Sequence, residues 1–595
     1  MAAVGLAGSS LAGGVSPAVA AAHTTVSAGV QSSGALADLS MCDPHTPASQ
    51  PYDVVSVGGT LFFTADDGVH GRELWKSDGT AGGTSLVKDI DAGSGDSYGG
   101  GPRSLTAVGG TLFFTADDGV HGTELWKSDG TKAGTVMVRD IYPGKSGGYD
   151  RNGPSSLTAV GGTLFFTADD DVHGRELWKS DGTKAGTVMV RNIYPGQGGY
   201  YDGVVSSLTD VGGTLFFAAD DGSTGQELWT SDGTKAGTVL VKDIRPGAYD
   251  STPRSLTGSG GTLFFTARDG VHGRELWKSD GTLGGTVLVK DILPGVGNSY
   301  HAPSYLTNVQ GTLFFSADDG TTGQELWRSD GSEDGTVLVK DIQPGDTGSY
   351  YDGPSDLAAA GSTLFFTADD DLHGEELWSS DGTEDGTAMV KDIQPGEYSS
   401  AVSGLTGSGG TVFFTARDGV HGPELWKSDG TEDGTVLVKD IHPGAGGSYY
   451  DDPSAVTVVG TTVFLGADDG VHGTELWKSD GTDDGTVLVK DINAGGAFRV
   501  APRGKADTAK GTLTVKVAVA GGGTLVVRPV ADSELKKATR VVTSADTTSI
   551  TLKPTRAGKR YLERHGTLQV RARFTFTPCG GAGSSVTHRF TLKMR

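Results

Sequence analysis

Residues 58–90 read GGTLFFTADDGVHGRELWKSDGTAGGTSLVKDI, and closely similar stretches occur nine times along the 595-residue chain. Each copy holds one tryptophan, and these nine are all the tryptophans of the protein. They follow one another at intervals of 48–52 residues: Trp75, Trp126, Trp178, Trp229, Trp277, Trp327, Trp378, Trp426 and Trp477. A constant core with intervals that differ by at most four residues indicates one structural unit, repeated nine times, with insertions accepted in a loop.

Four strand-like pieces separated by glycine turns make up each copy. In the second copy these pieces are Ser104–Val108, Thr111–Ala116, Glu124–Ser128 and Thr135–Ile141. Their β-branched and aromatic residues suit a pleated, buried surface, on which Leu125 and Trp126 should face opposite sides. Gly-Gly or Asp-Gly pairs separate the pieces, and Asp-Gly between strands is a strong hairpin signal. Each copy is therefore predicted to form one antiparallel four-stranded sheet.

A single sheet of this kind cannot bury both faces, whereas sheets stacked around an axis can. Four strands, glycine turns and one tryptophan per unit are typical of a β-propeller blade, with Trp and Phe side chains between blades. A linear β-solenoid is the alternative, although its coils are shorter and its ends need polar caps. Because the first copy has its first strand (Asp53–Val57) and the last copy its fourth (Thr486–Ile492), we expect nine whole blades. A ring of fewer blades with loose repeats stays open.

Glycine content and charge divide the chain into two modules. Most of the 96 glycines fall in the repeated turns, and glycine at this density excludes long helices. From Arg499 onward there are 19 Lys/Arg against 5 Asp/Glu, a net charge of +14, whereas the preceding residues have 29 against 68, a net charge of −39. Nucleic acid is excluded as a partner of the acidic module, because phosphates need Lys/Arg on the contact face. The basic module is either a solvated domain or a binder of an anionic polymer or surface.

The predicted fold class is therefore all-β. Residues 51–498 should form the nine-bladed propeller, and residues 499–595 a small, immunoglobulin-like β-sandwich. Strand-like runs in the second module lie at 512–520, 524–530, 549–553, 567–577 and 586–594. Only residues 533–539 (SELKKAT) have a helical pattern there.

Residues 1–22 are small and uncharged and end in an Ala-x-Ala pattern at Ala18–Ala20, like the latter part of a secretory signal. No Lys or Arg precedes Arg72, so a plain Ala/Gly leader is the alternative to a signal-peptide remnant. Residues 23–50 are predicted to be a flexible N-terminal segment. The chain contains no run of 18 or more apolar residues, so no membrane span is predicted.

The two cysteines, Cys42 and Cys579, flank the acidic module, and a disulfide between them in an oxidising compartment is a hypothesis.

The string ELWKSDGT at Glu73–Thr80 recurs in nearly the same form in seven further copies, and the sixth copy ends ELWRSDGS at Ser332. It resembles the repeat of the bacterial ELWxxDGT-repeat family, over roughly residues 53–495. The resemblance implies a secreted or surface-associated bacterial protein whose repeats form a propeller. It implies no catalytic residues, because the family has generally no assigned activity.

Carboxylates that occur in every copy are poor catalytic candidates, since nine equal active sites are implausible. Glu73, Asp67 and Asp78 have equivalents in all nine copies, and we interpret them as structural, chiefly as turn-making groups. Calcium bound by the ADDG hairpin is the alternative, but Arg268 and Arg417 replace the first Asp in two copies. We therefore expect no cofactor. His70 becomes Thr224 or Thr322 in two copies, which indicates a hydrogen-bonding or packing role.

Tyrosines and aspartates recur in the linkers between copies. In a propeller each linker joins an outer strand to the next inner strand, so these groups should lie on one face, called here the linker face. Aromatic rings with carboxylates suit sugars, peptides or cations, although each Tyr could instead pack under its own linker. The candidate binding residues are Tyr149, Asp150, Tyr201, Asp202, Tyr249, Asp250, Tyr351, Asp352, Tyr450 and Asp451.

These observations favour a secreted or cell-surface, monomeric and non-enzymatic propeller that acts as a binding or interaction module. The basic C-terminal domain would be its attachment or partner-binding unit. The expected partner is an extracellular glycan, a protein or an anionic cell-wall polymer. An extracellular glycan hydrolase or lyase with its site on the linker face is one alternative, and a structural surface component is another.

Overall fold

The computed structural model describes most of the chain from residue 48 onward. The described residues are 48–91, 101–143, 153–195, 205–295, 302–344, 353–443, 453–470, 472–493, 498–501, 504–519, 522–530, 533–542, 546–578 and 584–594. The structure within these ranges is almost entirely β, with a single α-helix among the described residues.

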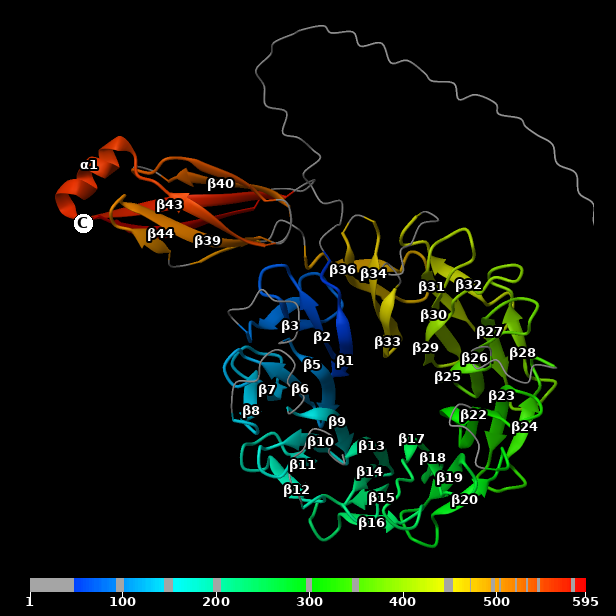
Figure 1. Cartoon of the computed structure of the whole chain (residues 1–595). Coiled ribbons are helices and arrows are strands. Elements are labelled where there is room, and N and C mark those ends of the chain that lie inside the picture. The colour runs from blue at the N-terminus through cyan, green and yellow to red at the C-terminus, as the bar shows by residue number, and fades with distance from the viewer. Residues whose placement is uncertain are drawn as a thin grey trace, which may run out of the picture. The chain divides into compact units, whose positions relative to one another are not determined.

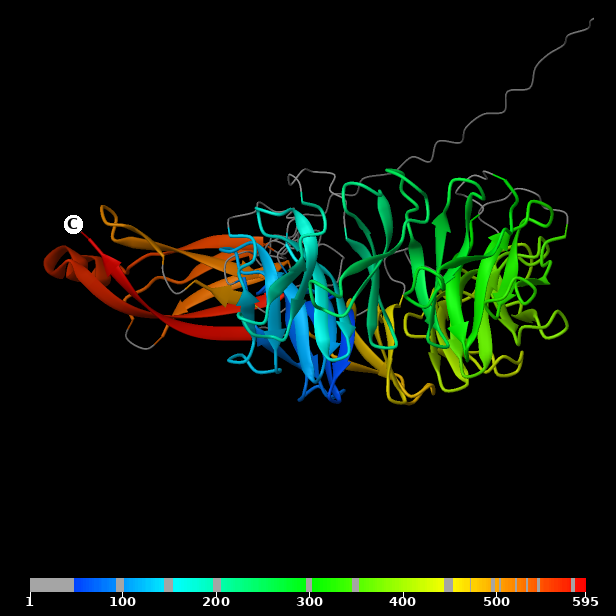
Figure 2. The same cartoon turned by 90° about the horizontal axis from the view of Figure 1, so that it is seen from below.

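Within the described part of residues 48–493 there are nine antiparallel sheets, each of four strands that pair in chain order. We number these sheets blade 1 to blade 9, and Figure 1 shows them arranged around a central axis. Figure 2 shows the blades from the edge of the ring, standing side by side. The prediction of nine whole blades is therefore confirmed, and the linear solenoid is wrong.

Corresponding strands of the nine blades have nearly equal lengths. The first, innermost strands are β1 (Tyr52–Val57), β5 (Arg103–Val108), β9 (Ser155–Val160), β13 (Ser206–Val211), β17 (Arg254–Ser259), β21 (Ser304–Val309), β25 (Ser355–Ala360), β29 (Ser403–Ser408) and β33 (Ser454–Val459). The second strands are β2 (Thr60–Asp66), β6 (Thr111–Asp117), β10 (Thr163–Asp169), β14 (Thr214–Asp220), β18 (Thr262–Arg268), β22 (Thr312–Asp318), β26 (Thr363–Ala368), β30 (Thr411–Ala416) and β34 (Thr462–Asp468).

The third strands carry the ELW letters of each repeat, and the fourth strands end at the Lys or Arg that precedes the Asp-Ile or Asn-Ile pair. The third strands are β3 (Arg72–Ser77), β7 (Thr123–Ser128), β11 (Arg175–Ser180), β15 (Gln226–Ser231), β19 (Arg274–Ser279), β23 (Gln324–Ser329), β27 (Glu376–Ser380), β31 (Glu424–Ser428) and β35 (Thr474–Ser479). The fourth strands are β4 (Ser85–Lys88), β8 (Val136–Arg139), β12 (Val188–Arg191), β16 (Val239–Lys242), β20 (Val287–Lys290), β24 (Val337–Lys340), β28 (Ala388–Lys391), β32 (Val436–Lys439) and β36 (Val487–Lys490).

The hydrophobic core lies between neighbouring blades. Because side chains alternate along a strand, Phe62 and Leu74 of blade 1 point toward blade 2, where they pack with Phe114 and Trp126. In the same way Leu125 packs toward blade 3, on the opposite side of β7 from Trp126. The predicted orientation of Leu125 and Trp126 is confirmed, and so is the place of the aromatic residues between blades.

The ring closes with the contacts used at its internal junctions. Phe464 and Leu476 of blade 9 pack against Phe63 and Trp75 of blade 1. The Nζ of Lys490 donates to the carbonyl oxygen of Thr84 at 2.7 Å and lies 6.0 Å from the centroid of the Trp75 ring. At the first internal junction, Lys88 donates to Thr135 at 2.7 Å and lies 5.1 Å from the Trp126 ring.

A short segment before blade 1 completes the closure. The backbone N–H groups of Ser49 and Gln50 both donate to the carbonyl oxygen of Thr474 in blade 9, at 3.0 Å, and the carbonyl oxygen of Ser49 accepts from Asp66 in blade 1 at 2.9 Å. Ser251 makes the equivalent bonds between blades 4 and 5, with Gln226 and Arg268. The segment 48–50 thus takes the place at the 9–1 junction that a linker occupies at an internal one.

The fourth strands are shorter than predicted. In blade 2 the strand ends at Arg139 rather than at Ile141. The N–H groups of Ile141 and Tyr142 turn away from the ladder and donate to the Glu124 carboxylate, each at 2.9 Å. The sequence pattern did not reveal this because the acceptor is a side chain 17 residues earlier in the chain.

Left-handed backbone conformations occur at fixed positions of each repeat. Asp171 and Asp371, which stand where other copies have the Gly of Asp-Gly, have φ values of 67° and 66°, as a turn glycine would. The second residue of the inner strand is also left-handed in blade after blade, for example Ser104 at 55° and Ser156 at 54°. The register of β5 shifts next to Ser104, so the inner strand carries a β-bulge that the sequence pattern did not predict.

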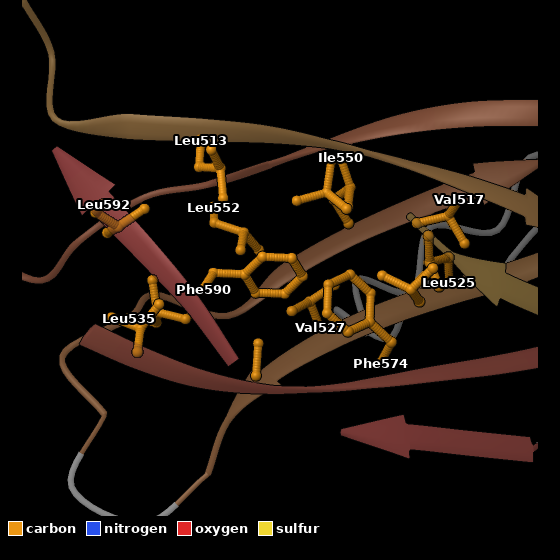
Figure 3. Close-up of a cluster of buried hydrophobic side chains, with 14 of the residues drawn as sticks. Leu513, Val517, Leu525, Val527, Leu535, Ile550, Leu552, Phe574, Phe590 and Leu592 are labelled. Carbon is orange, nitrogen blue, oxygen red and sulfur yellow. The ribbon is translucent and has the colours of Figure 1, made fainter. Parts of the chain in front are cut away.

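The C-terminal module is a β-sandwich of two sheets. One contains β37 (Phe498–Val500), β38 (Lys505–Asp507), β39 (Thr512–Val519) and β42 (Asp546–Leu552). The other has the order β41 (Ala538–Val542), β40 (Gly523–Pro529), β43 (Thr567–Pro578) and β44 (Ser584–Lys593). Residues from both sheets, among them Val517, Ile550, Phe574 and Phe590, form one core (Figure 3). The predicted immunoglobulin-like sandwich is confirmed, and β41 pairs with β40.

The helix of this module is not where the sequence pattern placed it. Residues 533–539 are not helical: Leu535 forms an isolated β-bridge with Pro554, and β41 begins at Ala538. The helix is α1 (Arg556–His565), in which the Thr555 hydroxyl caps the N-terminus by accepting from the Gly558 N–H, and Gly566 ends the last turn at φ 70°. No helix among the described residues is long and apolar enough to cross a membrane.

Candidate functional site

The linker face is formed by the hairpins between second and third strands together with the linkers that leave the fourth strands. In each of the eight internal junctions the residue after the VKDI letters, or their VRDI or VRNI equivalent, lies over the hairpin turn of the next blade. A Cβ on Gly119 would come within 3.0 Å of Asp91 Oδ1 of blade 1. Gln343 of blade 6 donates through Nε2 to Asp371 of blade 7 at 2.6 Å. At these junctions the start of the linker and the hairpin of the next blade therefore lie together.

The ELW glutamate is buried at the base of this face. Glu73 accepts from the N–H groups of Ile90 and Asp91, at 3.0 and 3.2 Å, and its equivalents accept from the same pair of amides in their own blades. Glu227 also accepts from the N–H and the hydroxyl of Ser251, at 3.1 and 2.6 Å. The role of this carboxylate is thus structural, although it ends a strand rather than forming a turn.

Burial raises the pKa of several of these carboxyl groups. It raises the pKa of Glu73 to about 8, of Glu275 to about 8 and of Glu176 to about 7, although each accepts two backbone hydrogen bonds. Desolvation disfavours the charged form of a carboxyl group, which is the direction observed. Since the side chains are buried, they do not meet a substrate at the surface.

The Asp-Asp-Gly turn is held together by its own side chains. Asp66 accepts from the Gly68 N–H at 2.7 Å, and Asp67 accepts from the N–H groups of Val69 and His70 at 2.9 Å. Burial opposes ionisation of Asp67, but its hydrogen bonds from His70 outweigh burial and hold the pKa of Asp67 below its usual value. These aspartates therefore make turns, as predicted.

The histidine of the repeat closes the same turn. Nδ1 of His70 lies 2.7 Å from Asp67 Oδ2, and in the copies with threonine the hydroxyls of Thr224 and Thr322 donate to their aspartates at 3.1 and 3.2 Å. The predicted hydrogen-bonding role is confirmed. No group of three or more His, Cys, Asp or Glu side chains arranged to hold a metal ion exists among the described residues.

The aspartate of the Ser-Asp-Gly-Thr turn, at the opposite end of the blade, is also occupied locally. Asp78 accepts from both the N–H and the hydroxyl of Thr80, at 2.9 and 2.7 Å. A Cβ on Gly130 of the next copy would lie 3.1 Å from Phe62 of blade 1, and Gly130 has φ 83°. Glycine is therefore required here both by the backbone conformation and by the neighbouring blade.

Two of the ten candidate binding residues lie in the described part of the chain. Tyr249 is 64% exposed, and the Arg245 guanidinium lies 4.9 Å from the centroid of its ring. Asp250 is exposed and accepts from the Gln226 N–H at 2.8 Å. Tyr398, in the linker after blade 7, is 71% exposed. At these two linkers the tyrosine side chain does not pack under its own linker.

The other eight candidate residues lie outside the described residues: Tyr149, Asp150, Tyr201, Asp202, Tyr351, Asp352, Tyr450 and Asp451. The two cysteines of the disulfide hypothesis, Cys42 and Cys579, also lie outside them.

One asymmetry of the ring escaped the sequence analysis. The exposed turns between third and fourth strands differ from one arc to the other. Blades 2–4 carry lysine there: Lys132, Lys184 and Lys235. Blades 6–9 carry acidic pairs: Glu333–Asp334, Glu384–Asp385, Glu432–Asp433 and Asp483–Asp484. A comparison of the two residues after each SDGT or SDGS string would have found this difference.

No protein-family model and no curated protein matches the chain. Among solved structures, puromycin hydrolase is similar with 16% identity and a TM-score of 0.34, over 73% of this chain and 58% of that protein. A puromycin-hydrolysing peptidase of Mycobacterium tuberculosis has 11% identity and a TM-score of 0.32, over 65% of this chain and 59% of that one. The β-propeller domain of the Trilobed protease from Pyrococcus furiosus has 9% identity and a TM-score of 0.29, over 63% and 95%.

The chain thus spans about three fifths of the length of the puromycin-hydrolysing proteins that it matches. At these identities and TM-scores the similarities carry no conclusion about activity.

Proposed function

We propose that the protein is a secreted or cell-surface propeller without catalytic activity, which binds an extracellular glycan through its linker face. The observation that best supports this proposal is that the repeated carboxylates accept the same structural hydrogen bonds in blade after blade. Glu73, Asp67 and Asp78 each have such partners, so they are not free to act on a substrate.

The exposed linker residues supply the binding chemistry. Tyr249 offers an aromatic ring for a sugar face, and Arg245 and Asp250 beside it offer polar groups for hydroxyls. The sequence repeats tyrosines and aspartates in the linkers, and repeated groups favour many weak contacts to a repetitive polymer, because linked sites bind with high effective concentration. In this proposal the basic C-terminal domain attaches the propeller to a second partner.

A glycan-binding screen of the full chain, run with and without calcium, tests the linker face. The double variant Tyr249→Ala/Tyr398→Ala should weaken binding at least tenfold, since loss of about 1.4 kcal/mol is a factor of ten. Tyr561→Ala is the matched control, because Tyr561 is an exposed tyrosine on α1. Absence of glycan binding by the correctly folded protein, or hydrolysis of the bound glycan, would contradict the proposal.

A further inference from the structure

Four arginines lie together on the outer face of the sheet formed by β40, β43 and β44. They are Arg528, Arg571, Arg573 and Arg589, and we call this group the arginine face. Arg528 is directly opposite Arg573 in the pairing of β40 with β43, and Arg571 is directly opposite Arg589 in the pairing of β43 with β44. All four are exposed. They form a diagonal stripe across three strands.

The inward-facing side chains of the same sheet are buried in the core of the domain. Val527, Ala572 and Phe574, which alternate with these arginines, are fully buried, and Figure 3 shows Val527 and Phe574 within the core. The arginine side chains therefore cannot turn inward. They are held on the outer face by the alternation of the strands.

No acidic side chain of the described residues neutralises this stripe. Among the described residues, no carboxylate forms an ion pair with any of the four arginines. The remaining outward positions of the three strands carry hydroxyl, amide or apolar groups and one further cation: Thr524, Val526, Thr567, Gln569, Thr575, Thr577, Ser585, Thr587, Thr591 and Lys593. Like charges placed directly opposite each other destabilise a sheet, so these two arginine pairs lower the stability of the domain.

The spacing of the stripe suits a chain of anions. Arg571 and Arg573 are two positions apart on one strand, which is about 7 Å, and neighbouring strands are about 4.8 Å apart. The stripe from Arg528 to Arg589 therefore spans about 12 Å, enough for two or three successive anionic groups of a linear polymer. Arginine forms paired hydrogen bonds with phosphate oxygens, and the hydroxyls of Thr575, Ser585 and Thr587 beside it can bind polyol groups.

We propose that the arginine face binds a linear phosphodiester polymer with a polyol backbone. The inference deepens the attachment role proposed above for the C-terminal domain and rests on it. The outward positions of β40, β43 and β44 carry no Trp, Tyr or Phe on which nucleobases would stack, which disfavours single-stranded nucleic acid. It also lacks the apolar centre with aromatic anchors that a protein interface uses.

The test measures binding of the full chain to poly(glycerol phosphate) between 50 and 300 mM salt. Four phosphate contacts predict a slope of log affinity against log salt of about −3, at about −0.7 per contact. The variant Arg571→Gln/Arg589→Gln should halve this slope. The control Arg556→Gln/Arg560→Gln removes the same charge from exposed positions of α1 and should leave the slope unchanged.

The variant Arg571→Lys/Arg589→Lys keeps the charge, and it replaces the glutamine variant in the test if the glutamine variant does not fold. It should retain the slope but bind more weakly, because lysine lacks the paired geometry. If the α1 control lost as much affinity and slope as the Arg571→Gln/Arg589→Gln variant, the proposal would be overturned, because binding would then depend on the net charge of the domain and not on the arginine face. Preferential binding to anionic lipid vesicles, or a salt-sensitive self-association through the acidic turns of blades 6–9, would also overturn it. The linker-face tyrosines are unchanged in all these variants and the glycan is not the ligand, so failure here leaves the glycan test standing.

Discussion

Removal of one buried carboxylate should open the propeller at a single place. Glu475 accepts four hydrogen bonds: from the N–H and hydroxyl of Ser49 at 3.1 and 2.6 Å, and from the N–H groups of Ile492 and Asn493 at 2.9 and 3.2 Å. At about 1 kcal/mol net for each bond, Glu475→Ala costs on the order of 4 kcal/mol. Only the two bonds from Ser49 cross the junction, so about 2 kcal/mol of that loss falls on closure and changes the closing equilibrium about thirtyfold.

Glu227→Ala is a matched control, because Glu227 accepts the same four bonds at the junction of blades 4 and 5. Its partners are the N–H and hydroxyl of Ser251 and the N–H groups of Ile244 and Arg245. There the linker joins the two blades covalently and keeps them at high effective concentration. At the 9–1 junction the contacts among the described residues are non-covalent.

Hydrogen exchange of two equivalent amides reports the difference. The Asp66 N–H is bonded to Ser49 and the Arg268 N–H to Ser251, at 2.9 and 3.0 Å. In Glu475→Ala the Asp66 amide should exchange about thirtyfold faster, because about 2 kcal/mol of closure is lost. In Glu227→Ala the exchange of the Arg268 amide should accelerate far less. Equal acceleration at both amides would refute the reasoning, because it would mean that segment 48–50 closes the ring no less firmly than a covalent linker.

Further outcomes follow from burial and backbone conformation. Since burial raises the pKa of Glu73 to about 8, the folded state keeps a proton that an unfolded glutamate releases near pH 4.5, so the free energy of unfolding should fall as pH rises from about 5 to 8. The raised pKa of His121, caused by its hydrogen bond to Asp118, acts in the same direction above pH 6.5. Denaturation midpoints at pH 5, 7 and 9 test this, and a midpoint that increases with pH would contradict it. Gly130→Ala should destabilise by about 1–2 kcal/mol in urea unfolding, because it adds a Cβ at positive φ against Phe62; an unchanged midpoint would count against that packing.

The repeat itself made most of the propeller predictable. Nine copies of one string fix the strand order, and the exchange of Gly for Asp171 and Asp371 already indicated a left-handed turn position. The exchange of His for Thr224 likewise indicated the hydrogen bond that the structure shows. Such inferences succeed because substitutions among copies within one chain report what each position must do.

Contacts across long stretches of sequence were not predictable in this way. Ser49 donates to Glu475, which lies 426 positions later in the sequence. Ser49 also precedes the first repeat, where the sequence has no periodicity. The capping role of Glu73 was missed because its partners lie 17 and 18 residues later, beyond the reach of a turn. The helix α1 was missed because Gly558 interrupts an otherwise clear pattern between Thr555 and Gly566.

The closing segment also determines how the propeller would respond to a pulling force. Asn493, after blade 9, donates through Nδ2 to the carbonyl oxygen of Ala48, before blade 1, at 3.2 Å. A force applied between the two ends of the chain therefore enters and leaves the ring at one junction. It loads the bonds of Ser49 first, while the eight covalently linked junctions carry no tension. Once that junction yields, the blades should peel off successively from their two ends, so the Ser49–Glu475 contact acts as the mechanical latch of the propeller.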